Sequence, residues 1–218
     1  MDDLLKLAHT LSHHTICGEG NVSGRDGDSF WIKASGTSLD TLKKEDLVAC
    51  HFNGVPFNAK DKPSMEVLFH AWIFDNYEEV NFIAHTHPTY ANKILCSGFC
   101  HDFAGRRLFP DQVVRNGRKS CLVPYATPGK ELRDEVKKQI KYFVEEEGFF
   151  PKLILLENHG IVTTGSSYKD CVASSLMCEK SAEIFVGARL LGQIQYLTQE
   201  QIDAVDKCPN EAYRRKIF

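Results

Sequence analysis

Apolar positions recur along the chain with two spacings, one typical of helices and one typical of buried strands. A spacing of three and four residues, with suitable flanking residues, predicts helices over 2–14, 41–47, 61–77, 89–96, 130–147 and 168–191, and a short one from Thr198. Apolar runs predict strands over 29–34, 48–52, 80–84 and 152–156. Residues 98–123 have no firm period, so no element is predicted there. The alternation of strands and helices is compatible with an α/β fold.

Two turns rich in small residues flank the strand expected over 29–34. Residues 18–25 are glycine-rich and are expected to form a turn after the first helix, and residues 35–38 form a second turn. The first turn is not a dinucleotide-binding loop, because it follows a helix and precedes a strand, whereas that loop follows a strand and opens a helix. Their backbone amides, hydroxyls and the Asn21 side chain can approach an anion closely. Together the turns are compatible with an oxyanion or phosphate pocket.

Composition and charge narrow the class of protein. The chain has 218 residues and no linker-like stretch, which predicts a single domain over 1–218. Its net charge is -3 with scattered basic residues, so nucleic acid is a disfavoured partner. No apolar run approaches the roughly 20 residues that span a bilayer, and no signal peptide is apparent, so a cytoplasmic protein without membrane contact is expected. The eight cysteines include no C-x-x-C pair and are expected to be free thiols.

A histidine pair follows the strand expected over 80–84. His85 and His87 are two residues apart, so in an extended chain both rings project from the same face and can bind one metal ion. His159 lies at the end of another predicted strand, beside Gly160. A lone histidine there is more often structural, but an incomplete pair makes His159 a candidate third ligand. His9 and His13, one helical turn apart, are expected to be structural.

Glu66 is the candidate acid/base residue. It follows Ser64 and Met65 at the expected start of a helix, where free N–H groups and the helix dipole favour an anion. From local sequence alone, Glu66 is more simply explained as a partner of that dipole. The alternative is that the helix packs across the next strand and directs Glu66 at the metal.

Five motifs together resemble the class II aldolase/adducin-like family, and within it the bacterial L-fuculose-1-phosphate aldolase type. In chain order they are 20–23 (GNVS), 34–37 (ASGT), 63–66 (PSME), 85–88 (HTHP) and 158–160 (NHG). The resemblance implies a three-layer α/β/α sandwich with a mainly antiparallel central sheet. It also implies a homotetramer with sites near subunit interfaces.

The resemblance implies a role for each motif residue. His85, His87 and His159 would bind Zn²⁺ or another divalent metal, and Glu66 would be the acid/base. The substrate phosphate would be bound by Asn21, Ser35, Gly36, Ser64 and Met65. Tyr213 resembles a catalytic tyrosine in the family's C-terminal tail. The implied reaction cleaves a ketose 1-phosphate to dihydroxyacetone phosphate and an aldehyde through an enediolate.

Two departures from the aldolase type leave other activities open. Met65 replaces a second serine, and residues 108–112 contain no tyrosine where that type has one to protonate the leaving group. A methylthioribulose-1-phosphate dehydratase has a similar arrangement of motifs. The pentulose-phosphate 4-epimerases carry Asp at the place of Glu66, which argues against them. A non-catalytic, adducin-like interaction module would have lost the metal ligands that this chain keeps.

Overall fold

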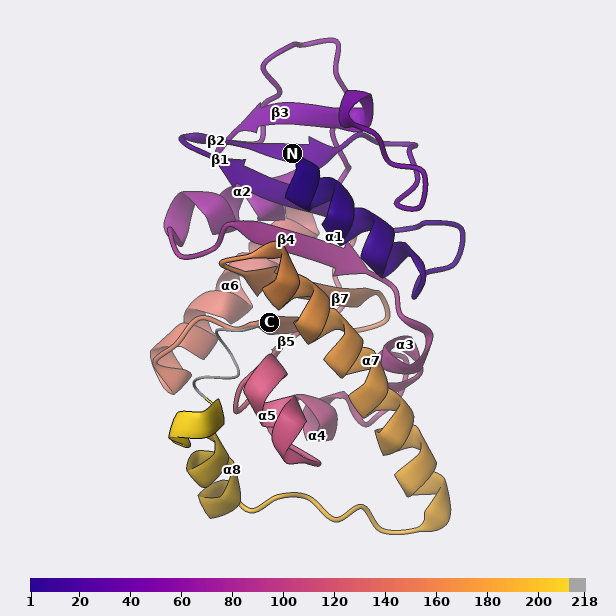
Figure 1. Cartoon of the computed structure of the whole chain (residues 1–218), viewed down its shortest axis with the longest axis vertical. Helices are drawn as coiled ribbons and strands as arrows, with labels where there is room; N and C mark the ends of the chain where they lie inside the picture. The colour runs from indigo at the N-terminus through magenta and orange to yellow at the C-terminus, as the bar shows by residue number, and fades with distance from the viewer. Residues whose placement is uncertain (212–218) are drawn as a thin grey trace.

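A seven-stranded sheet with the order β3-β2-β1-β4-β7-β6-β5 forms the centre of the protein (Figure 1). The computed structural model describes residues 1–211. The strands are β1 (Asn21–Asp26), β2 (Ser29–Lys33), β3 (Leu47–His51), β4 (Phe82–Thr86), β5 (Cys121–Val123), β6 (Leu153–Leu156) and β7 (Gly160–Gly165). Only β5 and β6 pair in parallel, and every other neighbouring pair is antiparallel. The expected mainly antiparallel sheet is therefore confirmed.

Helices cover both faces of this sheet (Figure 1). They are α1 (Asp2–Ser12), α2 (Val67–Asn76), α3 (Thr89–Leu95), α4 (Cys100–Gly105), α5 (Pro110–Asn116), α6 (Lys130–Glu147), α7 (Tyr168–Leu191) and α8 (Gln199–Asp206). Alternate residues of β6 divide the core: Ile154 packs with α2 and α6, whereas Leu155 packs with α3 and α7. Strand side chains that alternate between two buried faces produce three layers, as expected.

Strand β1 replaces the glycine-rich turn predicted over 18–25, so that prediction is wrong from Asn21 onward. The strand lies inside the sheet, between β2 and β4. The sequence of β1 lacks the apolar pattern of a buried strand, because the buried Ser23 side chain faces α2 and forms its hydrogen bond there instead of with solvent. Gly24 leaves room for the Phe82 ring, to which an added Cβ would approach within 3.3 Å.

Two predicted helices are shorter than expected. The helix expected over 61–77 begins at Val67, because the preceding backbone pairs with the end of β2: Ser64 N–H donates to the Lys33 carbonyl at 3.0 Å. The helix expected over 41–47 is only a 3-10 turn at Lys44–Asp46. The unpredicted stretch 98–123 contains α4, α5 and β5.

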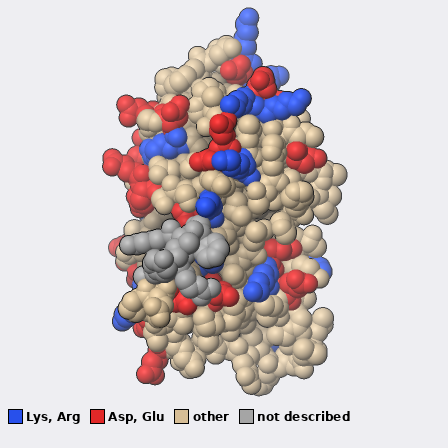
Figure 2. Space-filling view, in the orientation of Figure 1, with Lys and Arg blue, Asp and Glu red and all other residues tan. Residues whose placement is uncertain are grey.

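The surface carries both signs of charge. On the face shown in Figure 2, Lys and Arg are interspersed with Asp and Glu, in keeping with a net charge of -3. Within residues 1–211, no helix combines the length and the apolar character that crossing a membrane requires.

Candidate metal centre

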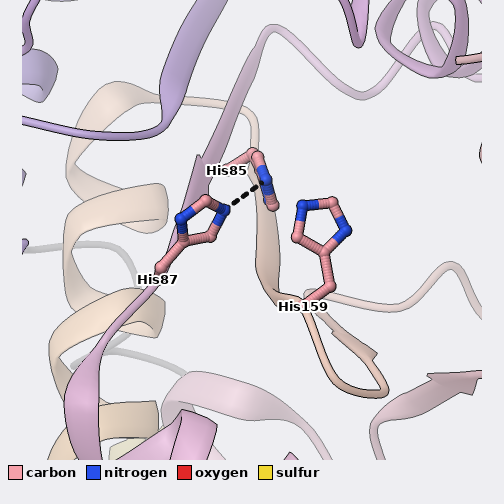
Figure 3. Close-up of side chains that lie close together, drawn as sticks. All are labelled: His85, His87 and His159. Atoms are coloured by element: carbon pink, nitrogen blue, oxygen red, sulfur yellow. Dashed lines mark hydrogen bonds between the residues drawn. The ribbon is translucent and has the colours of Figure 1, made fainter. Parts of the chain in front are cut away.

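Three histidine rings converge at one end of the two central strands β4 and β7 (Figure 3). His85 is in β4, His87 follows this strand, and His159 precedes β7. The antiparallel pairing of Thr86 with Ile161 brings these positions together. The ring centroids are 4.7 Å apart for His85 and His87, 4.8 Å for His85 and His159, and 5.2 Å for His87 and His159. The expected side-by-side placement of the pair, with His159 beside it, is confirmed.

The contacts of His85 and His87 orient both rings toward a common point. The Nδ1 atom of His85 donates to the Ile161 carbonyl at 2.9 Å, because a carbonyl oxygen can only accept. The Nε2 atom of His85 then lies 3.0 Å from Nε2 of His87. Two nitrogen ligands of a tetrahedral zinc ion are about 3.3 Å apart, given metal–nitrogen bonds of about 2.0–2.1 Å.

The donor set suits a divalent ion with an open coordination position. The candidate ligand atoms of the three rings all lie within 4.8 Å of one another. Within residues 1–211 this is the one group of metal-ligating side chains that comes together in this way. Three neutral nitrogen donors without a fourth cysteine or histidine are typical of a catalytic metal site and untypical of a structural one.

Glu66 directs its carboxylate into the same space. Its Oε2 atom lies 3.3 Å from Nε2 of His85, and its Oε1 atom lies 3.2 Å from Nε2 of His159. Asn21 donates its side-chain N–H to Oε2 at 2.6 Å. Burial would raise the pKa of the Glu66 carboxyl, but the two histidines outweigh burial and hold its pKa well below the ordinary value. Glu66 is therefore ionised and buried, with 9% of its surface exposed.

A pocket of about 300 Å³ opens beside this carboxylate. The five residues expected to bind phosphate all line it: Asn21, Ser35, Gly36, Ser64 and Met65. Glu66 and His87 lie in the same wall, so the pocket reaches from the candidate metal ligands to the two small-residue turns. Met65 is 71% exposed and does not fill the space that the pocket offers.

Lys33 is a cation in the pocket wall that was not predicted from the sequence. Its ammonium group donates to the Thr37 carbonyl at 2.5 Å and to the Ala34 carbonyl at 3.3 Å. Burial lowers the pKa of Lys33, although nearby Asp46 and Glu66 oppose this effect. A lysine at the end of a strand resembles a solvated residue in the sequence, and the adjoining Ser35-Gly36 turn was the signal that could have identified it.

Several other predicted residues lie outside this arrangement. Tyr213 falls beyond residues 1–211, which the structure describes. Residues 108–112 do not line the pocket. His9 has a structural contact, as expected, with its Nε2 atom 2.9 Å from the Leu42 carbonyl oxygen. All eight cysteines are free, which confirms the prediction.

Comparisons with known proteins extend over most of the chain. Residues 3–186 match the family model for the Class II Aldolase and Adducin N-terminal domain. The 3-oxo-tetronate 4-phosphate decarboxylase of Haemophilus influenzae is 31% identical over 192 residues, covering 87% of this chain and 86% of that protein. The L-fuculose phosphate aldolase of Methanococcus maripaludis strain C7 is 29% identical over 184 residues, covering 84% and 93%. Among solved structures, an L-fuculose 1-phosphate aldolase superposes with a TM-score of 0.81 at 23% identity, covering 94% of this chain and 93% of that one.

Proposed function

Because the chain belongs to the class II aldolase and adducin family, we propose that it is a metal-dependent lyase that breaks a carbon–carbon bond beside the carbonyl group of a sugar phosphate. The observation that carries this proposal is the meeting of three histidines and one buried carboxylate beside a pocket lined by groups that can bind an anion. The adducin-like interaction module is disfavoured, since a protein without catalysis has no need of this arrangement.

We propose Zn²⁺ as the ion that His85, His87 and His159 hold. The three imidazoles offer nitrogen donors within 4.8 Å of one another, and the 3.0 Å between Nε2 of His85 and Nε2 of His87 is close to the spacing at a tetrahedral ion. When bound, the ion would supply a Lewis acid that stabilises the negative charge on the oxygens of an enediolate.

The protein's own groups would move the proton and hold the phosphate. Glu66 is ionised, so it would first take a proton, from the substrate hydroxyl in cleavage or from carbon in the reverse direction. It would then return that proton to the carbanion carbon or to the new alkoxide. The hydroxyls of Ser35 and Ser64, the Met65 backbone N–H and the Lys33 ammonium would bind the phosphate, so that remote binding energy positions the reacting carbons.

The preferred substrate is a ketose 1-phosphate similar to fuculose 1-phosphate, with dihydroxyacetone phosphate and an aldehyde as products. A decarboxylation is the second candidate, favoured by the 31% identity to the 3-oxo-tetronate 4-phosphate decarboxylase. Loss of CO₂ from a 3-oxo-tetronate 4-phosphate leaves the enediolate of dihydroxyacetone phosphate, which is also what aldol cleavage leaves. The lack of a tyrosine in residues 108–112 also fits this reaction, because departing CO₂ needs no proton.

A product assay separates the two candidates. Zinc-loaded protein would be supplied in turn with fuculose, rhamnulose, ribulose and methylthioribulose 1-phosphates and with 3-oxo-tetronate 4-phosphate. Dihydroxyacetone phosphate released together with an aldehyde would support the aldolase, and the same product with CO₂ would support the decarboxylase. If none of the substrates yields dihydroxyacetone phosphate, the proposed reaction is wrong. The matched control is His159→Ala, which should lose both the metal and the activity.

The remaining expectations concern the whole protein. A single domain over 1–218, a cytoplasmic location and a homotetramer stay predictions from the sequence. Light scattering tests the homotetramer, because its mass would be about four times the 24.6 kDa of one chain.

A further inference from the structure

Glu19 lies beside the metal centre and has no part in the function proposed so far. Its Oε2 atom is 3.4 Å from the Nδ1 atom of His87. The Glu19 side chain is 41% exposed, whereas the His87 side chain is 24% exposed. Glu19 therefore lies at the solvent edge of the site and contacts the histidine that lines the pocket.

The local backbone brings Glu19 to this place. Gly20 separates Glu19 from β1 and has a φ of +102°, which is in the region that favours glycine. A Cβ atom at Gly20 would lie 2.3 Å from the carbonyl oxygen of His85, so the chain before β1 touches the end of β4. This close approach fixes the distance between the Glu19 backbone and His87.

The three histidines differ in what their Nδ1 atoms contact. For His85 the partner is the Ile161 carbonyl. The Nδ1 atom of His159 is buried without a hydrogen-bond partner among the described residues. Of the three Nδ1 atoms, that of His87 is the one that faces a carboxylate, and the opposite ring nitrogen of His87, Nε2, lies 3.0 Å from Nε2 of His85.

We propose that Glu19 is a positioning residue of the metal centre, which accepts the Nδ1–H of His87 and leaves Nε2 of that ring free for the ion. The inference rests on the metal centre of the proposed function. A carboxylate in this place fixes the ring's tautomer and orientation and makes it a more basic ligand. It also adds one negative charge beside three neutral donors. His87 needs such a partner more than His85 does, because His85 is fully buried and held by the backbone.

Metal affinity tests this role directly. The full chain would be stripped of metal, and the Zn²⁺ dissociation constant would be measured by competition with a chromogenic chelator. Loss of a carboxylate that orients a ligand typically weakens metal binding by about 10–100-fold, and we expect this for Glu19→Ala. Glu19→Gln should recover part of the affinity, because its amide oxygen can accept the same N–H without the charge.

Two further measurements exclude a general effect of the substitutions. Glu78→Ala is the matched control, because Glu78 is exposed and precedes β4 at the end opposite the histidines. The Zn²⁺ affinity of Glu78→Ala should stay within about twofold of wild type, because salt screens the electrostatic interaction between this distant, exposed carboxylate and the ion. The visible spectrum of the Co²⁺-loaded protein should change in Glu19→Ala and remain unchanged in Glu78→Ala.

The outcomes separate this inference from the proposed function. Wild-type affinity and an unchanged cobalt spectrum in both Glu19 variants would overturn the role of Glu19 and leave the metal centre standing. An equal loss of affinity in Glu78→Ala would overturn it as well, because net charge would then explain the effect. Wild-type protein that takes up no divalent ion would overturn both the metal centre and the role of Glu19.

Discussion

At the scale of single residues, the contacts of the Glu66 side chain distinguish between the two roles that the sequence left open: a partner of the helix dipole, or a carboxylate directed at the candidate metal ligands. Glu66 is the N-cap residue of α2, yet its side chain makes no capping hydrogen bond. Both carboxylate oxygens instead face histidine nitrogens, at 3.3 Å and 3.2 Å. The Glu66 carboxylate is therefore held by contacts with two histidines and with Asn21, and not by a hydrogen bond to the start of the helix.

Glu66→Gln should separate metal binding from turnover. The amide keeps the shape of the side chain but cannot carry a proton between substrate atoms. General acid–base catalysis typically contributes about 10²–10⁴-fold, so we expect kcat to fall by at least about 100-fold. Zinc content, measured by elemental analysis, should remain that of wild type. Full activity in this variant would contradict the proposed mechanism, and Glu78→Gln serves as the control.

Lys33 should act on substrate binding. A hydrogen bond to a charged group contributes about 1.5–3 kcal/mol, so Lys33→Met should raise KM for a phosphorylated substrate by about tenfold or more. Because the phosphate is remote from the breaking bond, kcat should change less than KM. Steady-state kinetics measures both, and thermal denaturation checks that the variant folds. An unchanged KM would show that Lys33 does not contact the phosphate.

At the scale of elements, strand β1 and helix α2 are joined by three polar contacts with matched spacing. They are Asn21 to the Glu66 carboxylate, Ser23 to the His70 ring and Arg25 to the Phe74 carbonyl, each at 2.6 Å. Four residues of strand span about 13 Å, and eight residues of helix span about 12 Å, so every second strand residue meets every fourth helix residue. These contacts fix how far α2 can slide along β1, and with it the position of Glu66.

His70 should make this helix–strand contact sensitive to acid. Burial lowers the pKa of His70 to about 3. Since an unfolded histidine titrates near 6.5, the unfolded chain binds an extra proton between these two pH values. Stability from a neutral His70 is therefore complete above pH 6.5 and is lost as the pH falls.

The comparison of wild type with His70→Gln isolates this contribution. Between pH 7 and pH 5, the wild-type free energy of unfolding should fall by about 2 kcal/mol more than that of the variant. Urea titrations of the metal-free proteins measure the difference, and the other histidines cancel because both proteins contain them. A difference that does not depend on pH would mean that folding leaves the pKa of His70 unchanged, which would contradict the prediction.

The sequence predicted the elements whose side chains carry a regular pattern. Helices α6 and α7 and strand β6 agree closely with expectation. Helix α6 presents apolar residues to the core at helical spacing, and β6 is a continuous apolar run whose four residues are all buried. Strand β1 was missed because its inward-facing residues are polar and satisfied by α2. The region around α4 and α5 was missed because it depends on Arg107, which is fully buried and donates to four backbone carbonyls. A buried charge held by the ends of short helices leaves no periodic signal.

The candidate site was more predictable than the fold around it. The motif resemblance identified the three histidines, Glu66 and five pocket residues, and the structure brings all of them together. Lys33 and Glu19 were not identified. Glu19 contacts His87, which is distant in sequence, and Lys33 lines a pocket whose wall is built from several segments of the chain. Both arrangements exist only after the sheet has formed.

At the scale of the whole molecule, metal binding should stabilise the entire fold. The candidate ligands come from β4, from the residue that follows it and from the turn before β7, which lie together only when β4 and β7 are paired. Free Zn²⁺ at about 100 times its dissociation constant should add about 2.7 kcal/mol to the free energy of unfolding. For a chain of this size, Tm should then rise by roughly 5–10 °C. Calorimetry with Zn²⁺ and with a chelator measures the shift, and an equal shift in His159→Ala would contradict the three-histidine site.

The central position of β4 also means that exchange of a bound ion should not require the sheet to open. Strands at the edges, β3 and β5, can fray and re-form while β4 stays paired on both sides with β1 and β7. Backbone amides at His85 should therefore exchange their hydrogens only in rare openings of the whole sheet. His87 follows β4 and lines the pocket, so we expect its ring to turn aside without any such opening. A bound ion should accordingly exchange faster than the amide hydrogen of His85, because the strand that carries the other ligand stays paired.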